Sequence, residues 1–84
     1  MPCVMRVDGF VFYMYFRDHG VPHLHAGLAG AWCVIGLGTP GEPPCILAEG
    51  DMRPIDARRA VWIVNSSQEL LLAQWRKHSG KSDA

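Results

Sequence analysis

The sequence predicts an α+β fold, in which two β-hairpins form a four-stranded antiparallel sheet and two C-terminal helices pack on one of its faces. Three observations support this: an Asp8-Gly9 dipeptide between two β-rich runs, a second pair of such runs joined at Ala29-Gly30, and helical periodicity in the C-terminal third. We expect one domain, given the length of 84 residues. Its predicted parts are hairpins in 1–37, a Pro/Gly-rich connection in 38–54, two helices in 55–79 and a tail in 80–84.

The first hairpin is the clearest local signal in the chain. Asp-Gly favours a two-residue type I′ turn, because both central positions of that turn take a positive φ. With this turn, one face of the hairpin is wholly apolar and must be the core face. The predicted opposed pairs on it are Val7–Phe10, Met5–Phe12 and Cys3–Met14. The other face carries Val4, Arg6, Val11, Tyr13 and Tyr15.

The second hairpin follows the same rule with a weaker turn signal, Ala-Gly. The predicted pairs are Leu24–Ile35 and Ala26–Cys33 on the apolar side, and His25–Val34 and Gly27–Trp32 on the other. Side chains alternate along a strand, so His23 and His25 should project together from the face opposite the core.

The segment at residues 38–54 contains four prolines and three glycines and is therefore predicted to be a connection. Only the run "CILA" within it could add a short edge strand. Apolar residues then recur at helical spacing from Ala57 to Val64, which predicts a helix that begins near residue 55 or 56. Ser66 followed three residues later by Glu69 matches a capping box, so a second helix is predicted to begin there.

Composition narrows the classes of function. Eight basic residues balance eight acidic ones, so the chain has no general positive field for a nucleic acid, and such a partner is disfavoured. The apolar run at residues 10–16 is far shorter than the roughly 20 residues of a membrane helix, and no signal-like segment is found, so we expect no membrane association. Three widely spaced cysteines without a C-x-x-C pair suit a reducing compartment, and we expect the cytoplasm.

The sheet face that the helices leave uncovered is the predicted binding surface. It combines aromatic, imidazole and guanidinium side chains, of which Tyr, Trp and Arg are enriched at protein interfaces. A small domain buries little surface on its own, so a partner that covers this face would add to its stability. The partner could be another protein or a second copy in a homodimer. The candidate partner-binding residues are Arg6, Tyr13, Tyr15, His23, His25 and Trp32.

The three histidines in "RDHGVPHLHAG" allow three interpretations. His19, His23 and His25 could bind zinc or another first-row divalent metal, since neutral imidazoles are common ligands of such ions. Two of them could act as acid and base in RNA cleavage, with Arg6 or Arg17 stabilising a phosphorane. In the third interpretation they are polar residues on a solvated strand. We expect a binding protein rather than an enzyme, with no catalytic residues and no required cofactor.

Three motifs in this chain resemble those of a family of small bacterial proteins known as the domain of unknown function DUF4160. The most specific is the Pro-His-x-His element, and the resemblance covers nearly the whole chain. The matching residues are Met1, Pro2, Val4, Arg6, Asp8, Gly9 and Phe10, then His19, Pro22, His23 and His25, and finally Leu71, Leu72 and Trp75. The chain departs from the family's pattern in a shorter turn between the third and fourth strands, in the "GTPGEPPC" insertion and in a less charged first helix.

This resemblance implies a partner role in compact two-gene bacterial modules of the toxin–antitoxin kind, and it implies no catalytic residues. We therefore expect a small regulatory protein, an antitoxin-like partner in a bacterial or phage-type two-component system, that binds and blocks another protein. The alternative is a histidine-dependent metal-binding or RNA-cleaving toxin.

Overall fold

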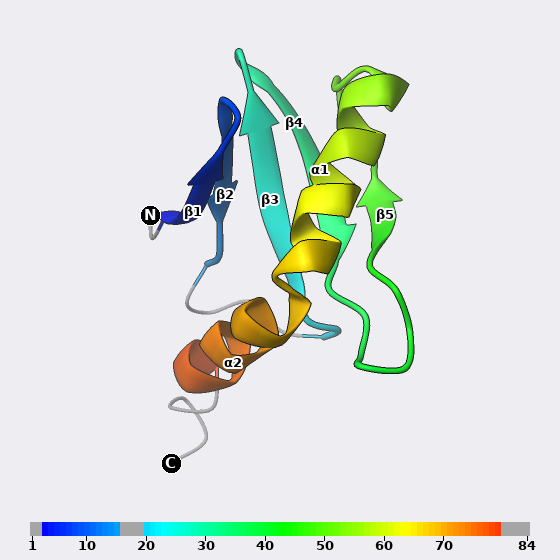
Figure 1. The fold of residues 1–84 in the computed structure, drawn as a ribbon. Coiled ribbons are helices and arrows are strands. Elements are labelled where there is room, and N and C mark those ends of the chain that lie inside the picture. The colour runs from blue at the N-terminus through cyan, green and yellow to red at the C-terminus, as the bar shows by residue number, and fades with distance from the viewer. Residues whose placement is uncertain (1–2, 16–19, 80–84) are drawn as a thin grey trace.

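The structure, a computed structural model, describes residues 3–15 and 20–79, and this part of the chain forms five strands followed by two helices (Figure 1). The elements are β1 (Cys3–Val7), β2 (Phe10–Tyr13), β3 (His23–Leu28), β4 (Ala31–Gly36), β5 (Cys45–Ala48), α1 (Pro54–Ser66) and α2 (Gln68–Ser79). The strands lie in the order β1-β2-β3-β4-β5, and each pairs antiparallel with the next. The predicted tail at 80–84 lies outside the described residues.

The α+β class is confirmed, but the prediction of four strands is wrong. The run "CILA" forms β5 inside the predicted connection and pairs with β4, with a shift of register between Val34 and Ile35. A short β-strand can pair with an existing strand edge even where proline-rich flanks weaken the local signal, because its partner supplies the backbone hydrogen bonds.

Both predicted hairpins form. Asp8 and Gly9 have φ of 52° and 85°, and Ala29 and Gly30 have φ of 50° and 87°, as a type I′ turn requires. All four predicted pairs of the second hairpin are confirmed, as are the first two pairs of the first hairpin. The pair Cys3–Met14 is wrong: Cys3 lies opposite Tyr13, because a register shift falls between Cys3 and Met5.

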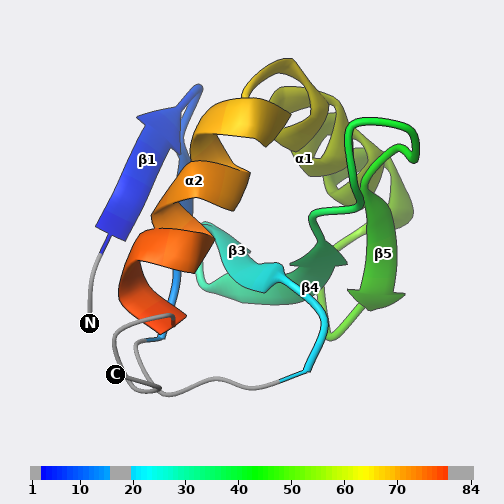
Figure 2. The same cartoon turned by 90° about the horizontal axis from the view of Figure 1, so that it is seen from below.

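The sheet curves around the two helices, so that they occupy its concave face and leave its convex face uncovered (Figure 2). Helix α1 runs along the β4 and β5 side, and α2 crosses the lower end of the sheet (Figure 1). The core between the layers contains the fully buried side chains of Phe10, Phe12, Met14, Leu24, Cys33, Ile35, Leu37, Val64 and Leu71. Burial of such side chains contributes roughly 1.5–3 kcal/mol each, which holds the two layers together.

Among the residues that the structure describes, one charged side chain is buried, that of Asp56 at the start of α1. The Arg53 guanidinium donates a hydrogen bond to its carboxylate over 2.9 Å, and Arg59 approaches from the next turn at 3.5 Å. The hydrogen bond from Arg53 holds the pKa of Asp56 below its usual value against the opposing effect of burial. Arg59 also stands 5.2 Å from the centre of the Phe10 ring, so this cluster joins α1 to the start of β2.

The predicted capping box at Ser66 and Glu69 is wrong. Ser66 is the last residue of α1, and its hydroxyl donates to the carbonyl of Trp62 one turn earlier. Serine hydroxyls in helices often donate to the carbonyl four residues earlier, and here this hydrogen bond replaces the predicted cap. Helix α2 begins at Gln68 instead. In the described part of the chain, neither helix is long and apolar enough to cross a membrane.

Cysteine reactivity provides a direct test of this layering. Cys33 is buried in the core, and burial raises the pKa of its thiol to about 11, whereas Cys3 and Cys45 are exposed. Only the thiolate reacts with a disulfide reagent. Titration with such a reagent at pH 8 should therefore modify two thiols rapidly and the third only after unfolding. Three rapid thiols in the native protein would place Cys33 outside the core.

Candidate functional site

The uncovered face of the sheet carries a cluster of aromatic side chains, which we call the convex aromatic face: Tyr13, Tyr15, His23, His25 and Trp32. The hairpin registers place Tyr13, His23, His25 and Trp32 there, since each alternates with a core residue along its strand. Tyr15 follows the end of β2 and joins the cluster through its ring contact with His25. Tyr13 on β2 and Trp32 on β4 reach toward each other over the intervening strand, with ring centres 5.5 Å apart. Trp32 lies opposite Gly27 of β3 and covers it with its ring, whereas Tyr13 lies opposite His25 of the same strand.

Gly27 is what allows the Trp32 ring to lie flat against the sheet. A Cβ atom at this position would stand 2.9 Å from the ring carbons, closer than such atoms approach one another. The ring buries the glycine backbone yet remains 39% exposed itself. Trp32 therefore combines a fixed position with a large accessible apolar surface, as an interface anchor requires.

The backbone of Trp32 is held from the other side by the loop after β5. Its N–H donates to the carboxylate of Asp51 over 2.7 Å. Gly50, with a φ of 58°, brings its own backbone against the carbonyl of Trp32. The tryptophan is thus fixed at both its ring and its backbone, which lowers the entropy lost when a partner covers it.

His23 and His25 continue the cluster toward the lower end of β3. Their ring centres are 5.9 Å apart, and Tyr15 meets His25 edge to face at 4.7 Å. Nδ1 of His23 lies 2.9 Å from the carbonyl oxygen of Val21. A carbonyl only accepts, so Nδ1 carries the hydrogen and donates.

The metal hypothesis stays a prediction, because one of its three proposed ligands is not described by the structure. His19 lies outside the described residues, and among those described no group of three His, Cys, Asp or Glu side chains is placed to bind an ion. His23 and His25 share a face as predicted, and each makes aromatic contacts: His23 lies 5.1 Å from Trp75 of α2. This last contact joins the convex aromatic face to the end of α2.

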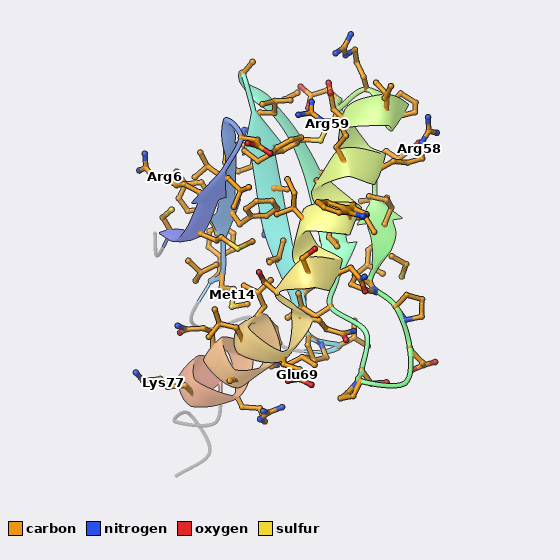
Figure 3. All side chains as sticks on the ribbon, in the orientation of Figure 1. Arg6, Met14, Arg58, Arg59, Glu69 and Lys77 are labelled. Atoms are coloured by element: carbon orange, nitrogen blue, oxygen red, sulfur yellow. The ribbon has the colours of Figure 1, made fainter. Side chains whose placement is uncertain are left out.

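Arg6 lies apart from the aromatic cluster. It projects from β1, the edge strand, and is exposed (Figure 3). Its cross-strand neighbour is Val11. Of the six predicted partner-binding residues, five form the aromatic cluster and Arg6 lies outside it on β1.

Two residues that sequence reasoning missed extend this face toward β5. Leu47, 48% exposed, lies over Gly36 of β4, where a Cβ atom would stand 3.2 Å from its side chain. Val21, 62% exposed, lines the same shallow depression as Leu47. The exposure of Leu47 on this face depends on β5 pairing with β4, and the four-strand prediction lacked that pairing.

Comparison with known proteins gives one result. A family model described as "Domain of unknown function (DUF4160)" matches residues 9–76, which is well over half of the chain and covers β2 to β5, α1 and most of α2. Searches of curated proteins and of solved structures found no match to the chain. On the strength of the family match, the chain belongs to the DUF4160 family.

Proposed function

We propose that this protein is a small interaction module that binds a partner protein through its convex aromatic face and thereby blocks that partner. In this role it is the antitoxin-like member of a bacterial or phage-type two-component system and acts in the cytoplasm. The observation that carries the proposal is the Tyr13–Trp32 pair, accessible on a sheet face that neither α1 nor α2 covers (Figure 2).

Physical arguments favour a protein as the occupant of this face. Tyrosine and tryptophan contribute large contact areas at low entropic cost and dominate the energetics of protein interfaces. A net charge of zero gives no general attraction to a polyanion. All three cysteines are free, which suits a reducing compartment. The antitoxin-like role itself is inferred from the family resemblance.

The test is a binding measurement against the protein encoded by the adjacent gene. Calorimetry should give a dissociation constant for the native chain that rises at least about tenfold in a Tyr13→Ala, Trp32→Ala double variant, because truncated anchor residues typically cost about 1–4 kcal/mol. Val21→Glu should also weaken binding, because it adds a negative charge next to the convex aromatic face. Val21 is exposed, so this substitution removes no core packing. The matched control is Trp62→Ala on α1, which removes a tryptophan that is 70% exposed on the other side of the molecule.

Three outcomes would contradict the proposal. The first is a loss of binding in the Trp62→Ala control that equals the loss in the double variant. The second is unchanged binding both in Val21→Glu and in the double variant. The third concerns the occupant: if ultracentrifugation shows that the chain alone dimerises and that Val21→Glu abolishes the dimer, a second copy covers the face. Melting temperatures of all variants separate binding effects from loss of the fold.

The alternative, a metal-binding or RNA-cleaving toxin, rests on the two imidazoles that lie 5.9 Å apart on one accessible face. Its test is a His23→Ala, His25→Ala double variant. Stoichiometric zinc in the purified native chain, or RNA cleavage that the double variant loses, would favour this alternative over simple binding. A purified native chain that forms the protein complex but holds no stoichiometric zinc and cleaves no RNA would exclude it.

A further inference from the structure

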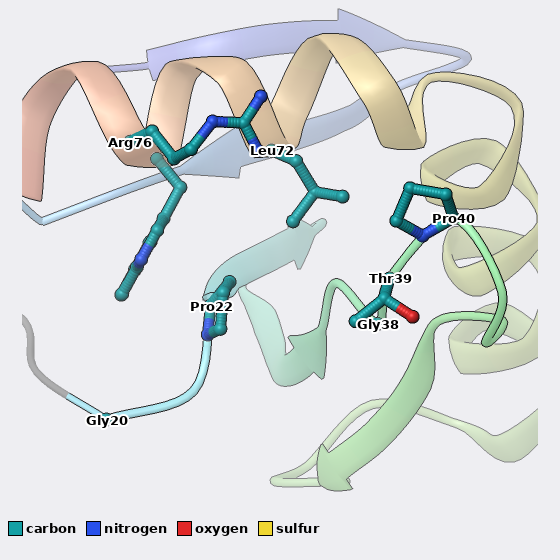
Figure 4. A pocket seen from close by; sticks show the side chains of 8 residues that line it. Gly20, Pro22, Gly38, Thr39, Pro40, Leu72 and Arg76 are labelled. Atoms are coloured by element: carbon teal, nitrogen blue, oxygen red, sulfur yellow. The ribbon is translucent and has the colours of Figure 1, made fainter.

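A concave pocket lies at the lower end of the sheet, outside the convex aromatic face (Figure 4). It is an open pocket with a volume of roughly 630 Å³, and it is bordered by three segments: the loop before β3, the loop after β4, and one side of α2. Pro22 lines it from the first loop, Pro40 from the second, and Leu72 and Arg76 from the helix (Figure 4). Trp75 of the same helix also lines it.

The walls of this pocket are fixed before any ligand arrives. Nε2 of Gln68, at the start of α2, lies 2.8 Å from each of three carbonyl oxygens, those of Leu37, Thr39 and Glu42. Thr39 and Glu42 also exchange backbone hydrogen bonds of 3.1 and 2.9 Å. The loop after β4 is thereby attached to α2, so binding in the pocket does not require this wall to become ordered.

The two loops are also tied to each other. The backbone N–H of Leu37 donates to the carbonyl of Pro22 over 2.9 Å, and the ring of Trp75 packs 5.1 Å from that of His23. The pocket is consequently continuous with the lower end of the convex aromatic face. A partner seated on that face could extend into it.

The chemistry of the lining defines the ligand. Proline, leucine and tryptophan side chains form an apolar interior, and Arg76 is the one charged residue among the described residues that line it. Within the described part of the chain, no carboxylate forms an ion pair with Arg76. An apolar pocket with a single cation at its rim is complementary to an apolar group that adjoins a carboxylate.

We propose that this pocket binds an apolar side chain next to an aspartate or glutamate, both contributed by the partner protein, with the carboxylate on Arg76. The partner as the source of this segment rests on the proposed function. The pocket itself rests on separate residues and can be tested without the partner.

The experiment is a titration of the isotope-labelled full chain, followed by amide chemical shifts. The probes are N-acetyl-Leu-Glu-amide, its neutral counterpart with Gln, and free 4-phenylbutyrate as a small carboxylate. The Leu-Glu peptide should shift the amides of Gly20, Gly38, Thr39 and Arg76 and leave those of β1 unchanged. Arg76→Gln should weaken its binding about tenfold, as expected for loss of one charge-assisted hydrogen bond. The matched control is Lys77→Gln, an exposed cation on the same helix that does not line the pocket.

Each result decides the assignment. Equal binding of the Glu and Gln peptides, or equal loss in Arg76→Gln and Lys77→Gln, would overturn it. Binding of 4-phenylbutyrate without binding of the Leu-Glu peptide would overturn the peptide as ligand and indicate a small-molecule site. Failure of the proposed function is distinguishable, since the double variant Tyr13→Ala, Trp32→Ala should leave the peptide titration unchanged whether or not it affects the partner.

Discussion

Phe12→Ala should remove about 3–5 kcal/mol from the free energy of unfolding, because the ring is fully buried in the core and its loss leaves a cavity. A domain of 84 residues has a total stability of about 4–13 kcal/mol, so this single change should leave the chain partly or wholly unfolded at 37 °C. Urea denaturation followed by circular dichroism measures the change directly.

The matched control is the next residue on the same strand. Tyr13 is half-buried on the convex face, where its ring contact with Trp32 contributes about 0.5–1.5 kcal/mol beyond area burial. Tyr13→Ala should therefore cost far less than Phe12→Ala and keep a cooperative unfolding transition. If the two variants lose equal stability, the assignment of the two sheet faces is wrong. The proposed binding face would then be wrong as well.

Gly50→Ala should cost about 2 kcal/mol or more, through backbone strain and a collision with β4. Gly50 has a φ of 58°, a region that alanine rarely adopts, and its added Cβ atom would collide with the carbonyl oxygen of Trp32. Relief of this collision would move the loop after β5 away from β4. The hydrogen bond from the Trp32 N–H to Asp51 would then be lost as well.

Gly41→Ala provides the comparison for this second prediction. Gly41 does not have a positive φ, and an added Cβ atom would have no neighbour within 4 Å, so its replacement should change stability by less than about 0.5 kcal/mol. Denaturation curves give both values, and the amide resonance of Trp32 should shift only in Gly50→Ala. Equal effects of the two substitutions would show that the loop does not hold Trp32 as described.

The register of both hairpins could be predicted because it depends on local chemistry. Two-residue turns with positive φ fix which residues oppose each other, and the side-chain period of two then separates a wholly apolar face from a mixed one. The pairing of Cys3 was predicted wrongly because the strand register shifts between Cys3 and Met5, and no residue in this segment signals such a shift. Strand β5 was missed from the strand count because its pairing with β4 crosses a proline-rich loop, and only the assembled sheet decides such non-local pairing.

Part of the candidate site could likewise be predicted from the sequence, and part of it could not. The position of Trp32 opposite Gly27 followed from the hairpin register, as did the shared face of His23 and His25. The contact between His23 and Trp75 joins residues more than fifty positions apart. It depends on how α2 crosses the end of the sheet, which the amphipathic pattern of a helix does not specify. The pocket beside Arg76 depends on the same crossing.

The close fit of Trp32 over Gly27 has an evolutionary consequence. A side chain at position 27 would displace the indole ring, and a small residue at position 32 would leave the backbone of β3 uncovered, so neither position can change freely alone. Across related sequences the two positions should therefore covary, with glycine accompanying tryptophan and larger residues at position 27 accompanying smaller ones at position 32. A lineage that changes its partner would be expected to alter both positions together.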